Sequence, residues 1–305
     1  MGARDGDGGG GGAGRRTVTR AGDYLDLVRA PASLTVLGDA LVGALSARGP
    51  GGDGAMRAGA LAASSVCLYS AGMALNDWAD ADLDAVERPE RPIPSGRISR
   101  ARALAVGAGL TAVGVGSAFA AGRSSGLVSL ALAGALWAYD LVFKPTAAGP
   151  VVMALCRGLD VMLGAAGPSW RRALLPAGAV AVHTVAVTAV SRGEVEGSTR
   201  ATGRAAVVAS VAVAASGLAG GGDRAAAALG GARYLAAVLP GHLAVARDPG
   251  ASQARDATRA GIRAVVPLQS ALAGRAGSAV AALALLGVEV VGRVLGRRRS
   301  RGDIT

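Results

Sequence analysis

Long apolar stretches alternate with short polar ones along the chain, and this pattern predicts helices that cross a membrane. A helix needs about 20 mainly apolar residues to span the hydrocarbon core of a bilayer. Several segments approach that length, and Gly or Pro separates most of them. They lie at about residues 32–48, 56–76, 101–121, 125–143, 147–167, 173–191, 204–220, 224–246 and 264–292. The sequence therefore predicts an all-α, multi-pass transmembrane helical bundle of about nine helices.

The last of these segments is unusual because Gly274 and Arg275 interrupt it. We expect a short interfacial helix before this break and the true span after it. Outside the predicted membrane domain, residues 23–292, lie two polar ends. Residues 1–22 are Gly-rich and charged, which is typical of a disordered cytoplasmic tail, and residues 293–305 form a basic C-terminal tail.

The composition supports a membrane protein. Charged residues make up 17% of the chain and the mean hydropathy is +0.41, whereas soluble domains contain roughly 25% charged residues. The abundant Ala and Gly suit helices that pack closely in lipid.

The net charge of +11 raises the possibility of a nucleic-acid partner. The Arg residues lie between apolar runs rather than in one patch, so no nucleic-acid partner is expected. With the N-terminus inside, the positive-inside rule instead places the Arg-rich interruptions in the cytoplasm. The two longest, 77–100 and 192–204, then form a polar cap on the cytoplasmic face of a cell-membrane protein. The basic end, 293–305, is an exception to this rule if nine helices span the membrane.

The first long interruption, 75-LNDWADADLDAVERPERPIPSGRIS-99, begins with a cluster of acids. At about 100° per residue, Asp77, Asp80 and Asp84 lie within roughly 60° of one another on a helix. Asn76 flanks this face and Asp82 points away from it. Three neighbouring carboxylates repel one another, and a cation relieves that repulsion. Oxygen ligands suit Mg²⁺, which typically binds one or two carboxylates together with substrate phosphates.

Arginines follow the acids directly, at positions 88, 91 and 97. Guanidinium groups supply forked donors that match phosphate oxygens. Acids, a divalent cation and arginines together indicate a diphosphate site at a membrane surface. The alternative is a solvated interfacial loop with scattered charges.

The same segment resembles the first signature of the UbiA superfamily of intramembrane prenyltransferases, N-D-x-x-D-x-x-x-D followed by a basic stretch that ends in R-P-x-x-S-G. The matching positions are Asn76, Asp77, Asp80, Asp84, Arg88, Arg91, Pro92, Ser95 and Gly96. The resemblance implies a bundle of nine transmembrane helices that extends over about residues 26–290. It also implies Mg²⁺-dependent transfer of a prenyl group from an isoprenyl diphosphate to an aromatic or other lipophilic acceptor.

A second acidic signature of that superfamily is only partly present, in 191-SRGEVEGSTR-200. Glu194 and Glu196 remain as possible metal ligands, with Glu194 also a catalytic candidate, whereas Ser191 and Ser198 stand where relatives have Asp. The resemblance implies a weaker second metal site or a different acceptor. The alternative is a polar loop without ligands.

The resemblance also implies further diphosphate ligands. Tyr139 and Lys144 are similar to a Tyr followed by a basic residue in relatives, and Arg29 precedes the first helix as a basic residue does there. Arg192 and Arg200 flank the second acidic stretch. For Lys144, at a helix end, snorkelling to the membrane surface is the alternative.

Charged residues also occur within apolar runs. Arg157 and Asp160 lie three residues apart and share a helix face. Charges within a membrane usually face a partner or a cavity. Either the two pair with each other, or Arg157 binds the diphosphate and Asp160 acts on the acceptor as a catalytic carboxylate. Relatives often have Asn at the position of Asp160. Asp39 is another such acid, and the sequence does not identify its partner.

The leading hypothesis is a prenyltransferase in which Asp77, Asp80 and Asp84 are catalytic. Two related enzyme hypotheses remain open: a UbiA-like terpene cyclase that needs no acceptor, and a transferase of phosphoribosyl groups. A membrane transporter or lipid-binding protein is the alternative of another class. Transporters often place charges at the midplane and show paired halves, whereas here the acids cap helices on one side.

Overall fold

The fold is an all-helical bundle, as the sequence predicts. A computed structural model of the chain describes residues 20–30, 34–48 and 55–302, and all its regular secondary structure in these ranges is helical. The predicted N-terminal tail, residues 1–22, lies largely outside these ranges, whereas residues 293–302 of the predicted C-terminal tail form the end of a helix.

Twelve α-helices occur in the described ranges, where nine were predicted. They are α1 Ala21–Leu27, α2 Leu34–Ala47, α3 Ala55–Ala79, α4 Ala81–Glu87, α5 Arg100–Ala121, α6 Arg123–Ala138, α7 Gly149–Gly164, α8 Leu174–Ser191, α9 Arg200–Leu218, α10 Arg224–Arg247, α11 Ala251–Arg275 and α12 Ala279–Gly302. A π-helix, η2 (Tyr139–Phe143), extends α6, and a 3₁₀ turn, η3 (Trp170–Ala173), precedes α8. The count differs because α1 and α4 are too short and polar for a membrane span, and because the ninth segment is divided.

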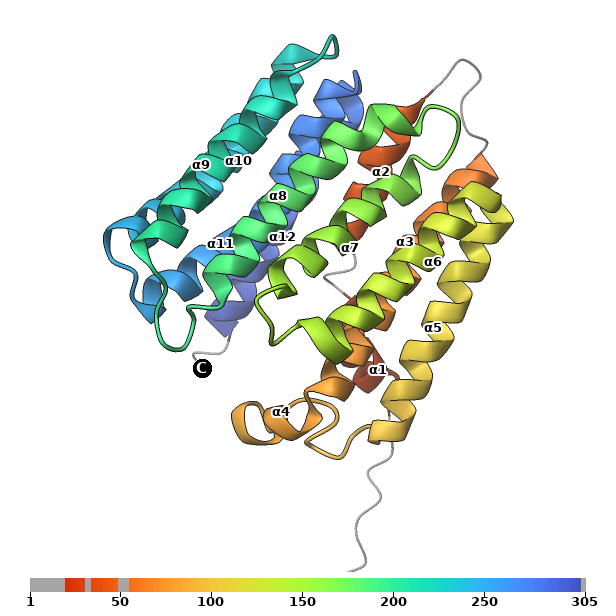
Figure 1. The fold of residues 1–305 in the computed structure, drawn as a ribbon, viewed down its shortest axis with the longest axis vertical. Helices are drawn as coiled ribbons and strands as arrows, with labels where there is room; N and C mark the ends of the chain where they lie inside the picture. The colour runs from red at the N-terminus through yellow and green to blue at the C-terminus, as the bar shows by residue number, and fades with distance from the viewer. Residues whose placement is uncertain (1–19, 31–33, 49–54, 303–305) are drawn as a thin grey trace, which may run out of the picture.

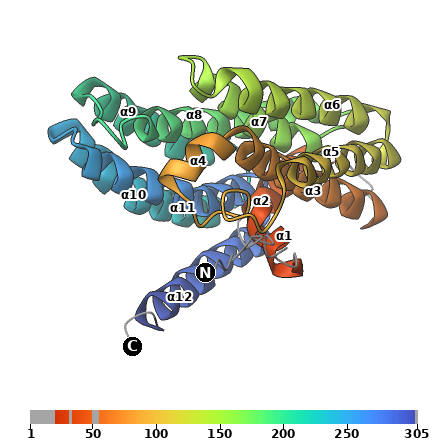
Figure 2. The same ribbon diagram turned by 90° about the horizontal axis from the view of Figure 1, so that it is seen from below.

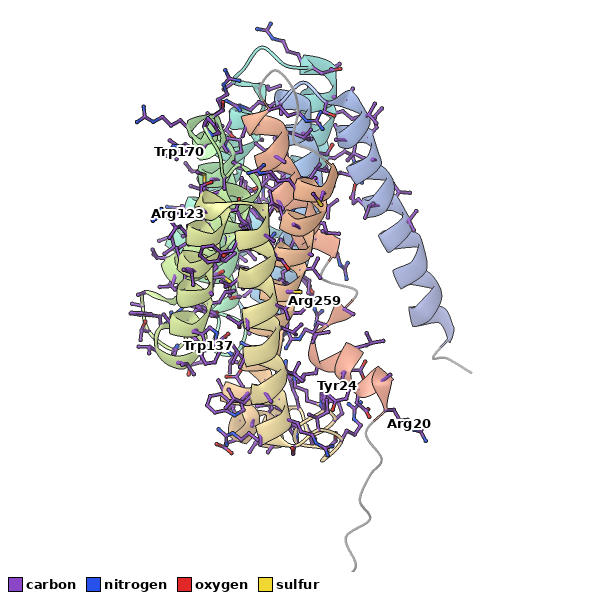
Figure 3. All side chains as sticks on the ribbon, turned by 90° about the vertical axis from the view of Figure 1, so that its right-hand side faces the viewer. Arg20, Tyr24, Arg123, Trp137, Trp170 and Arg259 are labelled. Atoms are coloured by element: carbon purple, nitrogen blue, oxygen red, sulfur yellow. The ribbon has the colours of Figure 1, made fainter. Side chains whose placement is uncertain are left out.

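Five helical segments in the described part of the chain are long and apolar enough to cross a membrane. They are Met56–Ala79, Arg100–Ala121, Arg123–Phe143, Trp170–Ser191 and Arg200–Leu218. Tyr24 of α1 and Trp170 of η3 lie near opposite ends of the bundle (Figure 3), where amphipathic aromatic rings meet the membrane–water interfaces.

The short interfacial helix predicted before the break at Gly274 is instead part of a long helix. Helix α11 spans Ala251–Arg275, and its first half is too charged to be recognised by hydropathy. One face of this half, with Ala254, Ala257 and Gly261, is buried against neighbouring helices. The predicted break after Gly274 is present: α11 ends at Arg275, and Gly277 turns the chain with a φ of 86°.

The bundle consists of two groups of helices joined through α2, α7 and α8 (Figure 1). Helices α3, α5 and α6 pack on one side, and α9, α10 and α11 pack on the other. A shared apolar core connects the groups through Val42 of α2, Val161 of α7, Val180 of α8 and Leu268 of α11. Helices α1 and α4 lie at the same end of the bundle (Figure 1), while α12 diverges from the other helices toward its C-terminal end (Figure 2).

Two glycines allow α2 and α7 to cross closely. A Cβ atom added at Gly164 would lie 2.0 Å from the carbonyl oxygen of Ala40, and one added at Gly43 would lie 1.9 Å from that of Val161. Real Cβ atoms do not approach backbone oxygens this closely, so any side chain would push the helices apart. This crossing holds the two groups of helices together.

We therefore expect Gly164→Ala to lower the free energy of unfolding by about 2 kcal/mol, the usual cost of overpacking. The control is Gly134→Ala on α6, because Gly134 is exposed and an added Cβ there meets nothing within 4 Å. That change should be neutral or slightly stabilising, since Ala favours a helix. Thermal unfolding in detergent measures both variants, and equal melting temperatures would contradict this account of the crossing.

Candidate active site

The acidic motif lies where α3 passes into α4. Asp80 stands between the two helices, but its N–H donates to the Asn76 carbonyl at 2.9 Å and its carbonyl accepts from the Asp84 N–H at 2.8 Å. These are helical hydrogen bonds, so the spacing of the motif is kept across the junction. The acids consequently stay on neighbouring turns, as the sequence spacing predicts.

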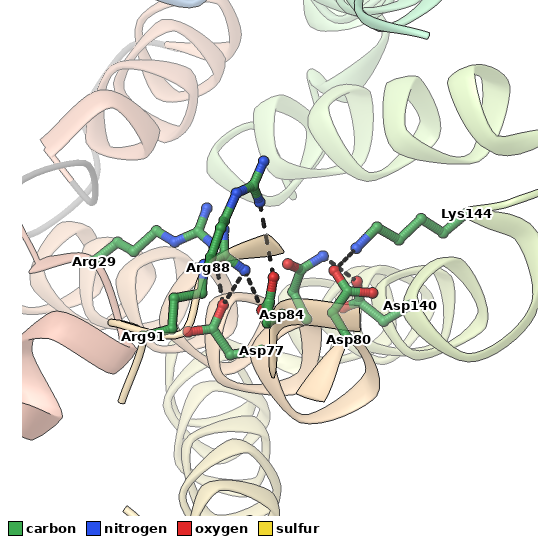
Figure 4. A network of polar contacts seen from close by, with 9 residues as sticks. Arg29, Asp77, Asp80, Asp84, Arg88, Arg91, Asp140 and Lys144 are labelled. Atoms are coloured by element: carbon green, nitrogen blue, oxygen red, sulfur yellow. Dashed lines mark hydrogen bonds and ion pairs between the residues drawn. The ribbon is translucent and has the colours of Figure 1, made fainter. Parts of the chain in front are cut away.

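Asp77 and Asp84 converge on one guanidinium group (Figure 4). The Nη1 atom of Arg91 lies 3.3 Å from Asp77 Oδ1 and 2.5 Å from Asp84 Oδ2. Arg29 donates to the same oxygen of Asp77 at 3.0 Å, and Arg88 lies 3.9 Å from Asp84. Both acids are almost fully buried, at 3% and 1% exposure. Buried carboxylates are costly unless they are paired, so these arginines compensate charge that the fold has removed from water.

Asp80 pairs instead with Lys144, the residue that follows η2 (Figure 4). The amide of Asn76 donates to Asp140 Oδ1 of η2 at 3.2 Å. Two contacts therefore connect the acidic motif to the end of α6. Lys144 is engaged by an acid rather than only snorkelling. Asp140 was not predicted as a site residue, but it belongs to this network. The only indication in the sequence is that an acid follows Tyr139 at the end of an apolar helix.

The π-helix η2 places these residues. Its backbone bond from the Lys144 N–H to the Tyr139 carbonyl, 2.9 Å long, spans five residues. Such widened turns interrupt α-helices frequently at functional sites. Tyr139 itself is buried beside Asp140, within reach of the charge of Asp80.

Arg97 ties the loop after α4 to α1. It binds Asp23 at 2.9 Å and Asp26 at 3.0 Å, and it donates to the Glu90 carbonyl at 2.8 Å. The backbone N–H of Arg20 and the guanidinium of Arg97 lower the pKa of Asp23 below its ordinary value. Arg97 therefore joins α1 to the loop that carries Arg88 and Arg91.

The second acidic stretch is not part of this network. Arg192 donates to the Thr146 carbonyl, and Arg255 donates to the backbone carbonyl of Glu194 at 2.6 Å. In the described part of the chain, no hydrogen bond or ion pair joins the side chains of Glu194, Glu196 or Arg200 to the acidic motif. A cavity of about 430 Å³ lies beside this loop, and its lining includes Pro150 of α7, Thr202 of α9, and Arg192 and Ser198 of the loop itself.

Arg157 and Asp160 do not pair with each other. Arg157 lies 2.8 Å from Asp39, and Asp160 accepts hydrogen bonds from the hydroxyl of Ser65 at 2.7 and 2.9 Å. Asp39 thereby gains the partner that the sequence does not identify. These contacts lie within the bundle, whereas the acidic motif lies at its end.

The acidic motif fits a divalent cation. Two carboxylates about two helical turns apart, those of Asp77 and Asp84, already meet one cationic atom, Nη1 of Arg91. Mg²⁺ favours one or two carboxylates, with phosphate oxygens completing its shell. Within the described ranges, no three Asp, Glu, His or Cys side chains gather closely enough to hold a metal by themselves. The residues therefore suit a cation that is shared with a phosphate ligand rather than a closed protein site.

The structure is thus an apolar helical bundle with buried acids, paired with basic side chains, at one end. Residues 36–248 match the model of the UbiA prenyltransferase family. The chain belongs to this family.

Curated relatives include two digeranylgeranylglyceryl phosphate synthases. The one from Methanopyrus kandleri is 38% identical over 145 residues, which cover 47% of this chain and 52% of that protein. The one from Ignicoccus hospitalis is 36% identical over 124 residues, which cover 40% of this chain and 39% of that protein. The matched part thus spans about half or less of these relatives.

Solved UbiA homologs share the fold. An apo homolog from Aeropyrum pernix K1 superposes with a TM-score of 0.64 at 19% identity, covering 78% of this chain and 96% of that one. A homolog from Archaeoglobus fulgidus bound to DMAPP and Mg²⁺ gives a TM-score of 0.55 at 18% identity, covering 64% and 76%.

The pairing of the acids by Arg91 predicts a large loss of stability in Arg91→Met. Two buried carboxylates lose their shared counter-charge, and breaking a buried pair costs about 3–5 kcal/mol. Because the same oxygens would then accept a cation, Mg²⁺ should raise the melting temperature of this variant more than that of the wild type.

Arg100→Met is the matched control, since Arg100 pairs with Asp82, whose side chain is 87% exposed. Surface pairs contribute about 0–1 kcal/mol, so this variant should unfold close to the wild type. Equal losses of unfolding free energy in Arg91→Met and Arg100→Met would contradict the role given to Arg91.

Proposed function

We propose that this protein transfers a prenyl group from an isoprenyl diphosphate to a lipophilic acceptor, in a reaction that needs Mg²⁺. The observation that carries the proposal is the convergence of buried Asp77 and Asp84 on one cationic atom at the end of an apolar bundle. Membership of the UbiA prenyltransferase family supports it, as do relatives named as prenyl-lipid synthases.

Asp77 and Asp84 are the proposed metal ligands, with Asn76 and Asp80 beside them. Mg²⁺ held there would supply positive charge next to the leaving diphosphate. Arg91 would then no longer be needed by the acids and could bind phosphate oxygens.

The other basic residues of the network complete the diphosphate site. Arg29, Arg88 and Lys144 each form an ion pair with an acid of the motif. Tyr139 lies next to this network. Donors that are already in place when negative charge develops are the main source of catalysis in such reactions. Here they favour breaking the bond between the prenyl carbon and the diphosphate oxygen.

The bundle provides the environment for the carbocation that forms. Its apolar interior excludes water, which would otherwise capture the cation. Asp160 is the buried acid that we assign to the acceptor: it orients the acceptor hydroxyl and takes its proton as the new bond to the prenyl carbon forms.

The second acidic stretch keeps a proposed role as a weaker metal site. Glu194 and Glu196 supply its carboxylates, and Arg192 and Arg200 supply nearby positive charge. Arg157 reaches the diphosphate only if it leaves Asp39. The Arg-rich loops favour an orientation in the cell membrane in which this end of the bundle faces the cytoplasm.

The metal site is tested by charge-neutral substitution. Asp77→Asn and Asp84→Asn should each reduce Mg²⁺-dependent diphosphate release by at least about a hundredfold, since each removes a ligand and a charge from the leaving-group site. Chelation of Mg²⁺ by EDTA should abolish release in the wild type. The measurement is release of diphosphate from a panel of labelled prenyl diphosphates with a lipid extract as the acceptor pool.

Asp82→Asn is the control, because Asp82 is exposed and points away from the motif. It should retain nearly full activity. Retained activity in Asp77→Asn, or equal activity with EDTA, would exclude the proposed site. Products formed without any acceptor would instead support a terpene cyclase.

A further inference from the structure

A second polar cluster lies deep in the bundle, between α2, α3, α7 and α11. Its members, here called the deep cluster, are Asp39, Ser65, Arg157, Asp160 and Gln269. Except for the partly exposed Arg157, each is at most 3% exposed. Ionisable residues within a membrane domain are costly and usually serve a ligand or a pathway.

In one half of the deep cluster the charges are paired, although among the described residues Gln269 Oε1 has no hydrogen-bond partner. Asp39 forms its ion pair with Arg157 at 2.8 Å, and the amide of Gln269 donates to Asp39 at 2.7 Å and to the Thr35 carbonyl at 2.6 Å. Gly38 makes this possible, because a Cβ atom there would lie 2.0 Å from the Gln269 side chain. The positive charge of Arg157 is thus committed to Asp39.

The other half has capacity left for a ligand. Both oxygens of Asp160 lie within hydrogen-bonding distance of the Ser65 hydroxyl, but a hydroxyl donates only one hydrogen. A carboxylate accepts several hydrogen bonds, so Asp160 can accept from a further donor. With both acids ionised, the two carboxylates and one guanidinium leave a net negative charge. Even with one acid protonated, the deep cluster has no surplus positive charge.

The deep cluster lies below the diphosphate site. Ser65 precedes Asp77 by twelve residues on α3, which is about 18 Å along a helix. The side chains, a metal ion and a diphosphate would take up much of that length, and the reacting prenyl carbon of a donor bound there would lie toward the deep cluster. Tyr69 lies between the two, within reach of the charges of both Arg29 and Arg157.

An apolar pocket of about 520 Å³ lies between α2, α3 and α7, and neighbours of the deep-cluster residues line it. Its lining includes Ala40, next to Asp39, and Leu61, one turn before Ser65 on α3. It also includes Gly164, one turn after Asp160 on α7. Apart from Arg48 at its far end, the lining is apolar. A lipophilic molecule with its apolar part in this pocket would have its polar end about one helical turn from Asp160.

We propose that the deep cluster selects an acceptor whose polar end is uncharged or cationic and donates a hydrogen bond, such as an alcohol, a phenol or an amine. This inference rests on the proposed prenyl transfer and adds the class of acceptor. A phosphate monoester carries a charge of about −1.5 to −2 at neutral pH. Placed against Asp160 it meets like charge without a free counter-ion, and such contacts reject a partner.

The test compares two ligands that differ only in charge: a prenyl glycerol ether and its phosphate ester. Their dissociation constants are measured on the protein in nanodiscs, with empty nanodiscs as the baseline. Geranyl thiodiphosphate and Mg²⁺ are present at saturation, so that the phosphate ester cannot occupy the donor site. The wild type should bind the neutral ether at least tenfold more tightly than the phosphate.

Asp160→Asn keeps the shape of the side chain and removes its charge, so it should reduce this preference at least fivefold. Ser65→Ala retains the charge and should retain the preference. Glu289→Gln neutralises a buried acid elsewhere, which pairs with Arg233 at 3.1 Å, and should not change it.

Equal or tighter binding of the phosphate by the wild type overturns the inference, and so does an unchanged preference in Asp160→Asn. Titration of geranyl thiodiphosphate with and without Mg²⁺ distinguishes a failure of this inference from a failure of the proposed function. Binding of that analogue that does not depend on Mg²⁺ refutes the donor site, and the inference falls with it. Mg²⁺-dependent binding combined with no preference between the acceptors refutes the inference alone.

Discussion

The burial of Asp77 and Asp84 at the end of an apolar bundle is the constraint on which the rest of the site depends. Removing two neighbouring carboxylates from water is unfavourable unless cations meet them. The fold meets them with Arg29 from the segment before α2, and with Arg88 and Arg91 from the loop after α4. The same need for positive charge suits the motif to the proposed Mg²⁺ ion.

The arrangement of the helices serves this constraint. Arg97 fixes the loop after α4 to α1, and Lys144 at the end of η2 meets Asp80 from the opposite side. The close crossing of α2 and α7 holds the two groups of helices together below the site. Charges at the end of the bundle and charges within it are therefore separate systems. At the end, the acids of the motif are matched by an equal number of basic side chains, whereas within the bundle two acids share one arginine.

Sequence reasoning succeeded where the determinants are local. The spacing of Asp77, Asp80 and Asp84 requires only a helical turn, and the apolar runs of α3, α5, α6, α8 and α9 follow from hydropathy. Sequence reasoning failed where packing between distant segments determines the structure. Gln269 reaches Asp39 across 230 residues, and α11 is helical because its small residues face the bundle even though its outer face is charged. Asp140 joined the site through a widened turn that the sequence does not signal.

The most direct test of the account is a structure with geranyl thiodiphosphate and Mn²⁺ in place of Mg²⁺, in which anomalous scattering locates the metal. We predict a metal peak between Asp77 and Asp84, bridged to the diphosphate, with the guanidinium of Arg91 turned from the acids to the phosphate oxygens. A metal bound elsewhere, or a diphosphate held away from these acids with Arg91 still bridging them, would contradict the account.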